Sequence, residues 1–121
     1  MVKYIEDTEL KKRAKLIADR FMLNHIDFDR VHCYRYSSNT RTIAKIIGFF
    51  KTLQLVYPDI KPYYVIVFND DNFLKQNKEE QDTTILHELL HIPKTFSGEY
   101  SKIAHHKIRE VSKRAFKRGL I

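Results

Sequence analysis

The segment from Asn77 to Pro93 constrains the fold most, because it predicts one helix with defined ends. Asn77 precedes Glu80 by three residues, which is the spacing of a capping box, and Pro93 stops a helix. The helix is therefore expected to run from about Lys78 to Ile92. Its apolar residues surround most of its circumference: Ile85, Leu86, Leu89, Leu90 and Ile92. A helix that is apolar on most sides must be covered by other elements.

Within this helix, His87, Glu88 and His91 form an HExxH motif. At about 100° per residue, the two histidines lie one turn apart and about 40° apart around the helix axis, so both imidazoles can reach one cation. Glu88 lies beside this pair, where it can hold a water that the metal activates. The motif predicts a metal-dependent hydrolytic site. The alternative is two ordinary histidines that bind no metal.

A catalytic zinc needs three protein ligands and an open fourth position. Gly98 can turn the chain back toward the motif, and a last helix is expected from about Ser101 to Lys117 with its apolar residues on one face. His105 lies nearer to that face than His106, and Glu110 points away from it. We therefore expect zinc on the two motif histidines and His105. The full set of candidates for the third ligand is His105, His106, Glu99 and Glu110.

Upstream of the motif, the sequence predicts one helix and three strands. Apolar residues at helical spacing predict a helix from Thr8 to about Asn24. The segments Val31–Tyr36 and Thr42–Ile47 are expected to form a hairpin, although the second arm also fits a helix. The segment Gly48–Tyr57 fits a short helix or an irregular connection, and Tyr63–Phe68 is the clearest strand. The fold class is therefore α+β, with a small three-stranded antiparallel sheet.

Composition points to one globular domain over residues 1–121, since 43% of the residues are hydrophobic and 31% are charged. The single cysteine, Cys33, excludes an internal disulfide and favours a reducing compartment. The N-terminus lacks the apolar core of a signal peptide, and no apolar run approaches the length of a membrane span. We therefore expect a cytoplasmic protein with no membrane partner.

The run from His87 to Pro93, followed by Phe96–Gly98 and a later histidine, resembles the small metallopeptidases of phages and archaea. More distantly, it is similar to SprT-like zinc proteases. The likeness covers about residues 31–106 and includes Tyr64–Val67 upstream of the motif. It implies a minimal zincin, in which a small sheet packs against the active-site helix and zinc binds the two motif histidines and the later one. The family has one histidine where this chain has two in succession.

Such a site predicts peptide-bond hydrolysis on a protein or peptide substrate. Glu88 would accept a proton from the attacking water and pass it to the leaving amine. The strand Tyr63–Phe68, or an arm of the hairpin, is expected to pair with an extended substrate. The side chains that could stabilise the carbonyl oxygen are Tyr100, Arg109 and the one of His105 and His106 that does not bind metal.

The chain is basic, with a formal net charge of +7, and its field attracts polyanions. Two groups of basic residues lie in the expected first and last helices: Lys11, Lys12, Arg13 and Lys15, and Lys102, Lys107, Arg109, Lys113, Arg114, Lys117 and Arg118. Solvated helix faces are the ordinary interpretation, and phosphate binding is the alternative. The competing function is therefore a nucleic-acid-binding module with a structural or vestigial metal. An inactive or regulated peptidase homologue is a third interpretation.

Overall fold

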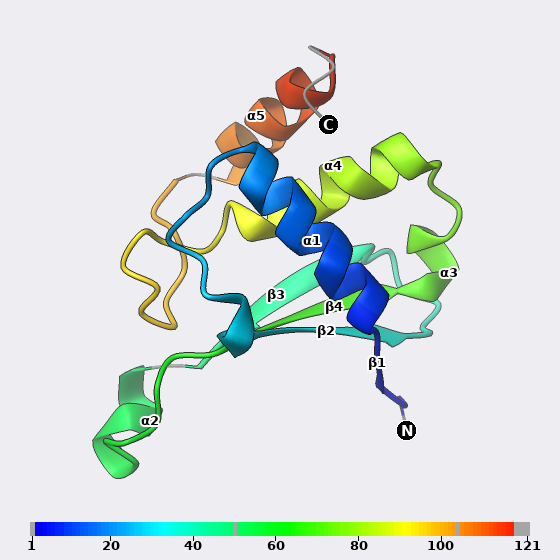
Figure 1. The fold of residues 1–121 in the computed structure, drawn as a ribbon. Helices are drawn as coiled ribbons and strands as arrows, with labels where there is room; N and C mark the ends of the chain where they lie inside the picture. Colours follow the sequence, from blue (N-terminus) through cyan, green and yellow to red (C-terminus); the bar gives the residue numbers. More distant parts are fainter. Residues whose placement is uncertain (1, 50, 104, 118–121) are drawn as a thin grey trace.

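The structure, a computed structural model, describes residues 2–49, 51–103 and 105–117, with the side chains of residues 51, 105, 116 and 117 excepted. Four strands, five α-helices and one short 3-10 helix occur in this part of the chain, so the fold is α+β, as predicted (Figure 1). The elements are β1 (Ile5–Glu6), α1 (Thr8–Arg20), the 3-10 helix (Phe28–Arg30), β2 (Val31–Tyr36), β3 (Ala44–Gly48), α2 (Lys51–Val56), β4 (Tyr64–Asn69), α3 (Asp70–Phe73), α4 (Lys78–Leu89) and α5 (His105–Lys117).

The four strands form one mixed sheet in the order β1-β2-β4-β3. β2 and β4 are parallel, with Val31 opposite Tyr64, while the other two pairs are antiparallel. Five of the six residues of β4 are buried, including neighbours that point to opposite faces, and such a strand belongs in the middle of a sheet. β3 alternates between exposed and buried residues and forms one edge.

The predicted hairpin between Val31–Tyr36 and Thr42–Ile47 is wrong, and the predicted three-stranded antiparallel sheet is a four-stranded mixed one. β4 lies between β2 and β3, so these two strands share no ladder. A strand buried on both faces needs a neighbour along each edge, and this requirement outweighs the short connection between β2 and β3. β1 has only two residues, too few for a detectable pattern.

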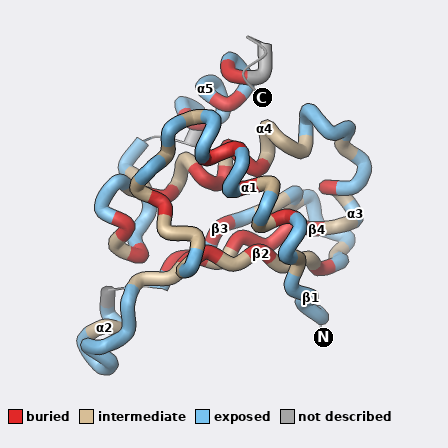
Figure 2. The backbone as a smooth tube through the Cα atoms, in the orientation of Figure 1, coloured by how far each residue is buried: buried red, intermediate tan, exposed pale blue. Residues whose placement is uncertain are grey.

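Helices α1 and α4 lie side by side over the same face of the sheet (Figure 1). Figure 2 shows the buried residues gathered along the strands and on parts of these two helices. Arg13 of α1 donates a hydrogen bond of 2.7 Å to Asp82 and one of 3.0 Å to Gln81, both on α4. The core between the layers includes Ala14, Ile17, Val31, Ile66, Phe68, Ile85, Leu86 and Leu89.

Helix α1 begins at Thr8, as predicted, and ends at Arg20 rather than at Asn24. Asp7 caps its start, because the carboxylate accepts a hydrogen bond of 3.0 Å from the backbone N–H of Leu10. At the other end, Met22 has a φ of 54°, which is the left-handed conformation that terminates many helices. The chain therefore leaves the helix earlier than its apolar periodicity indicates.

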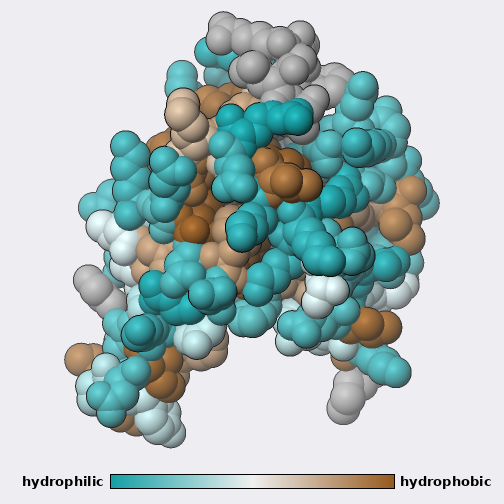
Figure 3. All heavy atoms as spheres, viewed as in Figure 1, coloured by the Kyte–Doolittle hydropathy of each residue, from teal (hydrophilic) through white to brown (hydrophobic). Residues whose placement is uncertain are grey.

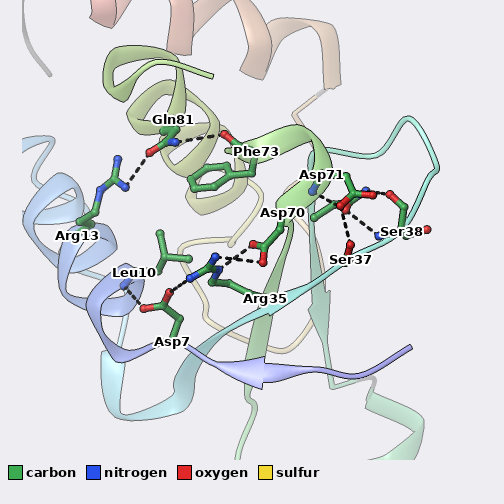
Figure 4. A network of polar contacts seen from close by, with 11 residues as sticks. Asp7, Leu10, Arg13, Arg35, Ser37, Ser38, Asp70, Asp71, Phe73 and Gln81 are labelled. Carbon is green, nitrogen blue, oxygen red and sulfur yellow. Dashed lines mark hydrogen bonds and ion pairs between the residues drawn. The ribbon is translucent and has the colours of Figure 1, made fainter. Parts of the chain in front are cut away.

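A second polar network joins the start of α1 to the end of the sheet (Figure 4). The guanidinium of Arg35 on β2 donates to both carboxylate oxygens of Asp70, at 2.7 and 3.1 Å, and lies 3.4 Å from Asp7. The bidentate bond to Asp70 raises the pKa of Arg35. Arg35 thus holds both the N-terminal segment and α3 to β2, an inner strand of the sheet.

Polar side chains also hold the loop that leads into β3. Asn69, the last residue of β4, is fully buried, and its amide donates a 3.0 Å hydrogen bond to the carbonyl of Thr42. Asn72 donates hydrogen bonds of 2.7 Å to the carbonyls of Thr40 and Thr42. These bonds hold the backbone on both sides of Arg41.

Helix α2 projects from the body of the protein, in the segment expected to be a short helix or an irregular connection (Figure 1). Its side chains are largely exposed, and Figure 3 shows apolar surface at this end of the molecule. None of the helices in the described ranges combines the length and apolar composition of a membrane span.

Tyr64 holds the chain between α4 and α5 against the sheet. Its hydroxyl accepts a hydrogen bond of 2.9 Å from the N–H of Gly98 and donates one of 2.6 Å to the carbonyl of Glu99. Gly98 has a φ of +87°, and a Cβ atom there would collide with the carbonyl oxygen of Phe49. A Cβ atom at Gly48 would likewise collide with the carbonyl oxygen of Gly98. The two glycines let this loop approach the end of β3 backbone to backbone.

We expect Gly98→Ala to lower the free energy of unfolding by about 2–4 kcal/mol, because alanine must adopt a left-handed conformation and also displace the Phe49 carbonyl. Urea denaturation followed by circular dichroism measures the change. Lys94→Ala, an exposed position in the same loop, is the control and should change stability by less than about 0.5 kcal/mol. Equal stability of the two variants would contradict the close approach.

Candidate metal centre

The start of α4 is capped as the sequence predicts. The side-chain oxygen of Asn77 accepts a hydrogen bond of 2.8 Å from the N–H of Glu80, and the carboxylate of Glu80 accepts one of 3.0 Å from the N–H of Asn77. This reciprocal pair satisfies two backbone donors that a helix start otherwise leaves open. The helix begins at Lys78, so the register of the motif along the helix is defined from its first turn.

The other end of α4 differs from the prediction, since the regular helix stops at Leu89 rather than at Ile92. The last turn tightens, and the N–H of His91 donates to the carbonyl of Glu88 at 3.1 Å, three residues back. The tightening is small, so His91 still follows His87 by one turn. The proline after Ile92 disfavours a helical conformation at that residue, so the helix could not have extended to Ile92 as predicted.

The imidazoles of His87 and His91 lie with their Nε2 atoms 3.4 Å apart and their ring planes at 70°. Two nitrogens bound tetrahedrally to one zinc, each about 2.0–2.1 Å from it, are about 3.3–3.4 Å apart. Both histidines are half-buried. The spacing of the two rings therefore fits one shared metal ion.

Glu88 is a buried carboxylate beside this pair. Its residue is 7% exposed, and burial raises the pKa of the carboxyl to about 7. The other buried polar residues in the described ranges, Asn69 and Ser112, both make hydrogen bonds. The carboxylate of Glu88 has no hydrogen-bond or ion-pair partner among the described residues. A carboxylate without a protein partner at such a position is suited to a cation and a polar ligand.

Of the three predicted metal ligands, the structure brings His87 and His91 together. The side chain of the third, His105, lies outside the described residues. Among the alternatives, His106 and Glu99 are exposed. Glu110 is also exposed, and its carboxylate lies 3.8 Å from the guanidinium of Arg114. Among the side chains that are described, no three metal-ligating groups converge.

The chain returns to the motif just before α5. The N–H of Ser101 donates a hydrogen bond of 2.7 Å to the carbonyl of His91, and this bond holds Ser101 outside the helix. Residues 101–103 therefore lie outside the helix that was expected to start near Ser101, and the structure describes α5 over His105–Lys117. The first residue of α5 thus follows the contact with His91 by four residues.

Two cavities meet at Glu88, which lines both of them together with Ala44 of the edge strand β3. The first, about 560 Å³, lies between β3, α4 and α5 and borders His87. The second, about 410 Å³, borders His91 and has Tyr100 on its wall. The motif therefore opens into a cleft that follows the edge of the sheet.

Sequence reasoning expected an arm of the hairpin to pair with substrate, but it did not show that one arm, as β3, lines the cleft at the motif. The hairpin prediction paired Thr42–Ile47 with the wrong neighbour and so concealed that Ala44–Gly48 is an edge strand. The alternating exposure of β3 has a counterpart in the sequence, but the alternation alone does not show which elements lie on either side. The position of Arg41 beside the motif was missed for the same reason.

Residues 2–117 match the model of a family described as “Putative phage metallopeptidase”. The chain belongs to this family. No curated protein and no solved structure matches it. Membership in the phage metallopeptidase family confirms the resemblance inferred from the run His87–Pro93, while the more distant likeness to SprT-like proteases remains a prediction. It also supports a peptidase that depends on a metal ion.

We expect His87→Ala to lower the metal bound after dialysis against zinc from about one ion per chain to less than about a tenth, because one of two converging imidazoles is lost. Elemental analysis by plasma mass spectrometry measures the bound metal. His32→Ala on β2, a histidine outside both cavities, is the matched control and should leave the metal content unchanged. If both variants bind metal equally, the metal centre does not lie at this motif.

Proposed function

We propose that the chain hydrolyses peptide bonds in protein or peptide substrates, with zinc as cofactor and Glu88 as general base. The observation that carries this proposal is the 3.4 Å separation of the His87 and His91 Nε2 atoms beside a buried carboxylate without a described partner. Zinc, when bound, supplies the Lewis acidity that activates water and polarises a carbonyl near neutral pH. Imidazole ligands suit zinc among the divalent ions available to proteins.

We assign the third ligand to His105. The hydrogen bond between Ser101 and the carbonyl of His91 brings the returning chain to the motif four residues before His105. His106 is exposed, and Glu110 already faces Arg114. Three histidine ligands leave the fourth position of a tetrahedral ion open for catalysis.

Glu88 acts on protons in this reaction. Its carboxylate accepts a proton from the attacking water and then donates it to the leaving amine nitrogen, so the proton balance closes without a covalent intermediate. Burial supports this role, because it raises the pKa of the metal-free carboxyl to about 7 and so makes the carboxylate a stronger base than an exposed one.

Tyr100 is the best placed of the side chains considered for the carbonyl oxygen of the substrate. It lines the second cavity together with Glu88 and His91. Its hydroxyl oxygen accepts a hydrogen bond of 3.2 Å from the N–H of Gly48, which leaves the hydroxyl proton available to donate. We therefore assign Tyr100, rather than Arg109 or His106, to the charge that develops on that oxygen.

The edge strand β3 is the part of the sheet that supports substrate binding. Of the two alternatives expected to pair with substrate, Tyr63–Phe68 is wrong, because β4 is already paired along both edges, whereas the hairpin arm Thr42–Ile47 overlaps the edge strand β3. β3 pairs with β4 on one side only, and its residues Ala44–Ile46 line the cleft. An extended peptide that adds to this edge passes directly over Glu88.

Nucleic-acid binding is the second candidate function, and the exposed basic residues of α5 favour it. Among them are Lys107, Arg109 and Lys113. The basic group on α1 carries less unneutralised positive charge than the sequence indicates, because Arg13 pairs with Asp82 at 2.7 Å and Lys12 pairs with Glu9 at 3.3 Å. We therefore place this candidate behind peptide hydrolysis.

We expect Glu88→Gln to lower kcat/KM on an unfolded protein substrate by about 10²–10⁴-fold while zinc content stays unchanged, because the amide cannot accept the proton. Fluorogenic cleavage assays and elemental analysis measure the two quantities on the same preparation. Glu79→Gln, an exposed position in the first turn of α4, is the control and should retain activity.

Activity that survives Glu88→Gln would exclude Glu88 as the base. An absence of cleavage by the wild type, combined with DNA binding that weakens steeply with salt and ignores both Glu88→Gln and chelators, would favour the nucleic-acid function instead.

The third ligand is tested by two adjacent substitutions. We expect His105→Ala to lose most of the bound zinc and His106→Ala to keep it, because we assign the ligand to the first residue of α5. Zinc titration against a chromogenic chelator measures both affinities. Loss of zinc by His106→Ala but not by His105→Ala would assign the ligand to His106. Retention of zinc by both variants would exclude both histidines as ligands.

A further inference from the structure

The larger of the two cavities is lined by more basic than acidic side chains. It borders the catalytic candidate Glu88, and three basic side chains line it: Arg41, Arg109 and Lys113. Apart from Glu88, one acidic residue lines it, Glu80. With both carboxylates ionised, the wall of this cavity still carries one net positive charge. A side chain that enters it therefore meets a positive potential.

The three basic side chains lack acidic partners within the described residues, whereas arginines elsewhere in the fold have them. Arg13, Arg30 and Arg35 each contact a carboxylate at 2.7–2.9 Å. Glu80 does not fully neutralise these basic side chains, because one of its carboxylate oxygens accepts a hydrogen bond from the N–H of Asn77 in the capping box. Like charges gathered around one cavity repel one another, and an anionic ligand relieves this repulsion.

The backbone holds these basic residues at the cavity from two directions. Asn72 donates hydrogen bonds to the carbonyls of Thr40 and Thr42, which flank Arg41 on either side. Arg109 and Lys113 lie one turn apart on α5, so they share a face of that helix. A wall built from a hydrogen-bonded loop and a packed helix is preorganised for recognition.

The cavity also has a defined place along the substrate. β3 runs from Ala44, which lines both cavities, toward Gly48, which is hydrogen-bonded to Tyr100 of the second cavity. Antiparallel pairing is the more stable mode for a peptide added to a sheet edge. In that mode the residues that follow the scissile bond lie beside the start of β3, next to the basic wall.

We infer that this cavity binds an acidic side chain of the substrate on the C-terminal side of the scissile bond, with Arg41, Arg109 and Lys113 as its specificity-determining residues. This inference rests on the proposed peptidase function and adds the substrate class to it. Lysine at the same substrate position is disfavoured, because it would place a fourth positive charge in the cavity.

The test uses fluorogenic peptides that differ only in carrying Glu, Gln or Lys directly after the cleaved bond, which mass spectrometry of the products locates. The wild type should cleave the Glu peptide with a kcat/KM about fivefold above that of the Gln peptide. Raising the salt concentration from about 0.05 to 0.5 M should reduce this preference. Equal rates for Glu and Gln, or faster cleavage with Lys, would overturn the inference and leave the proposed function intact.

Charge reversal supplies the specific control. Lys113→Glu and Arg41→Glu should each abolish the preference for Glu over Gln, and the double variant should favour Lys. Lys107→Glu makes the same change of charge on α5 outside the cavity, so its preference should match that of the wild type. An equal effect of Lys107→Glu and Lys113→Glu would overturn the inference, because it would trace the preference to overall charge.

A binding measurement separates this inference from the peptidase function. If the wild type cleaves none of the peptides, the proposed function fails, and the cavity is then tested by fluorescence anisotropy with labelled peptides and zinc-treated Glu88→Gln protein. About fivefold tighter binding of the Glu peptide than of the Gln peptide, lost when Lys113→Glu is added, would support the cavity assignment. Equal binding of the two peptides would overturn it.

Discussion

The burial of Glu88 on α4 is the constraint on which the rest of the structure depends. The C-terminal part of α4 is apolar on most sides, so the protein covers it with the sheet, α1 and α5, and the same cover leaves Glu88 only 7% exposed, where it lines the two cavities. Partial burial disfavours the charged form of Glu88 and raises its pKa to about 7, while Ile85, Leu86 and Leu89 of the same helix pack in the core. The fold thus retains a locally unfavourable group at the point where two cavities meet.

Local patterns predicted the elements of this fold better than their arrangement. The capping box at Asn77, the start of α1 at Thr8 and the strand beginning near Tyr63 each depend on neighbours within a few residues, and the structure contains all three elements. The hairpin failed because strand pairing here is decided by burial rather than by proximity along the chain. The central strand β4 takes a parallel partner more than thirty residues away, Val31 opposite Tyr64, and separates β2 from β3.

The same difference between local patterns and tertiary arrangement applies to the candidate metal centre. The relation between His87, Glu88 and His91 follows from helical geometry alone, so the motif could be placed on one helix before any tertiary contact was known. The walls of the cleft could not be placed from the sequence, because β3, the loop at Arg41 and Tyr100 reach the motif only through nonlocal packing. The approach of the returning chain to the motif could not be predicted either, because the hydrogen bond from the N–H of Ser101 to the carbonyl of His91 is a nonlocal contact.

Both outer walls of the cleft are anchored at the two ends of β4, and this explains how a short chain can shape a specific site. Tyr64, its first residue, holds the returning loop through Gly98 and Glu99, and that loop leads to Tyr100. Asn69, its last residue, holds the loop before β3 and with it the region of Arg41. Because β4 is the most buried strand, both anchors start from the core of the sheet, and they position the two cavities along its edge. The central strand lines neither cavity, but in the proposed function it would determine where the side chains of both walls meet the substrate.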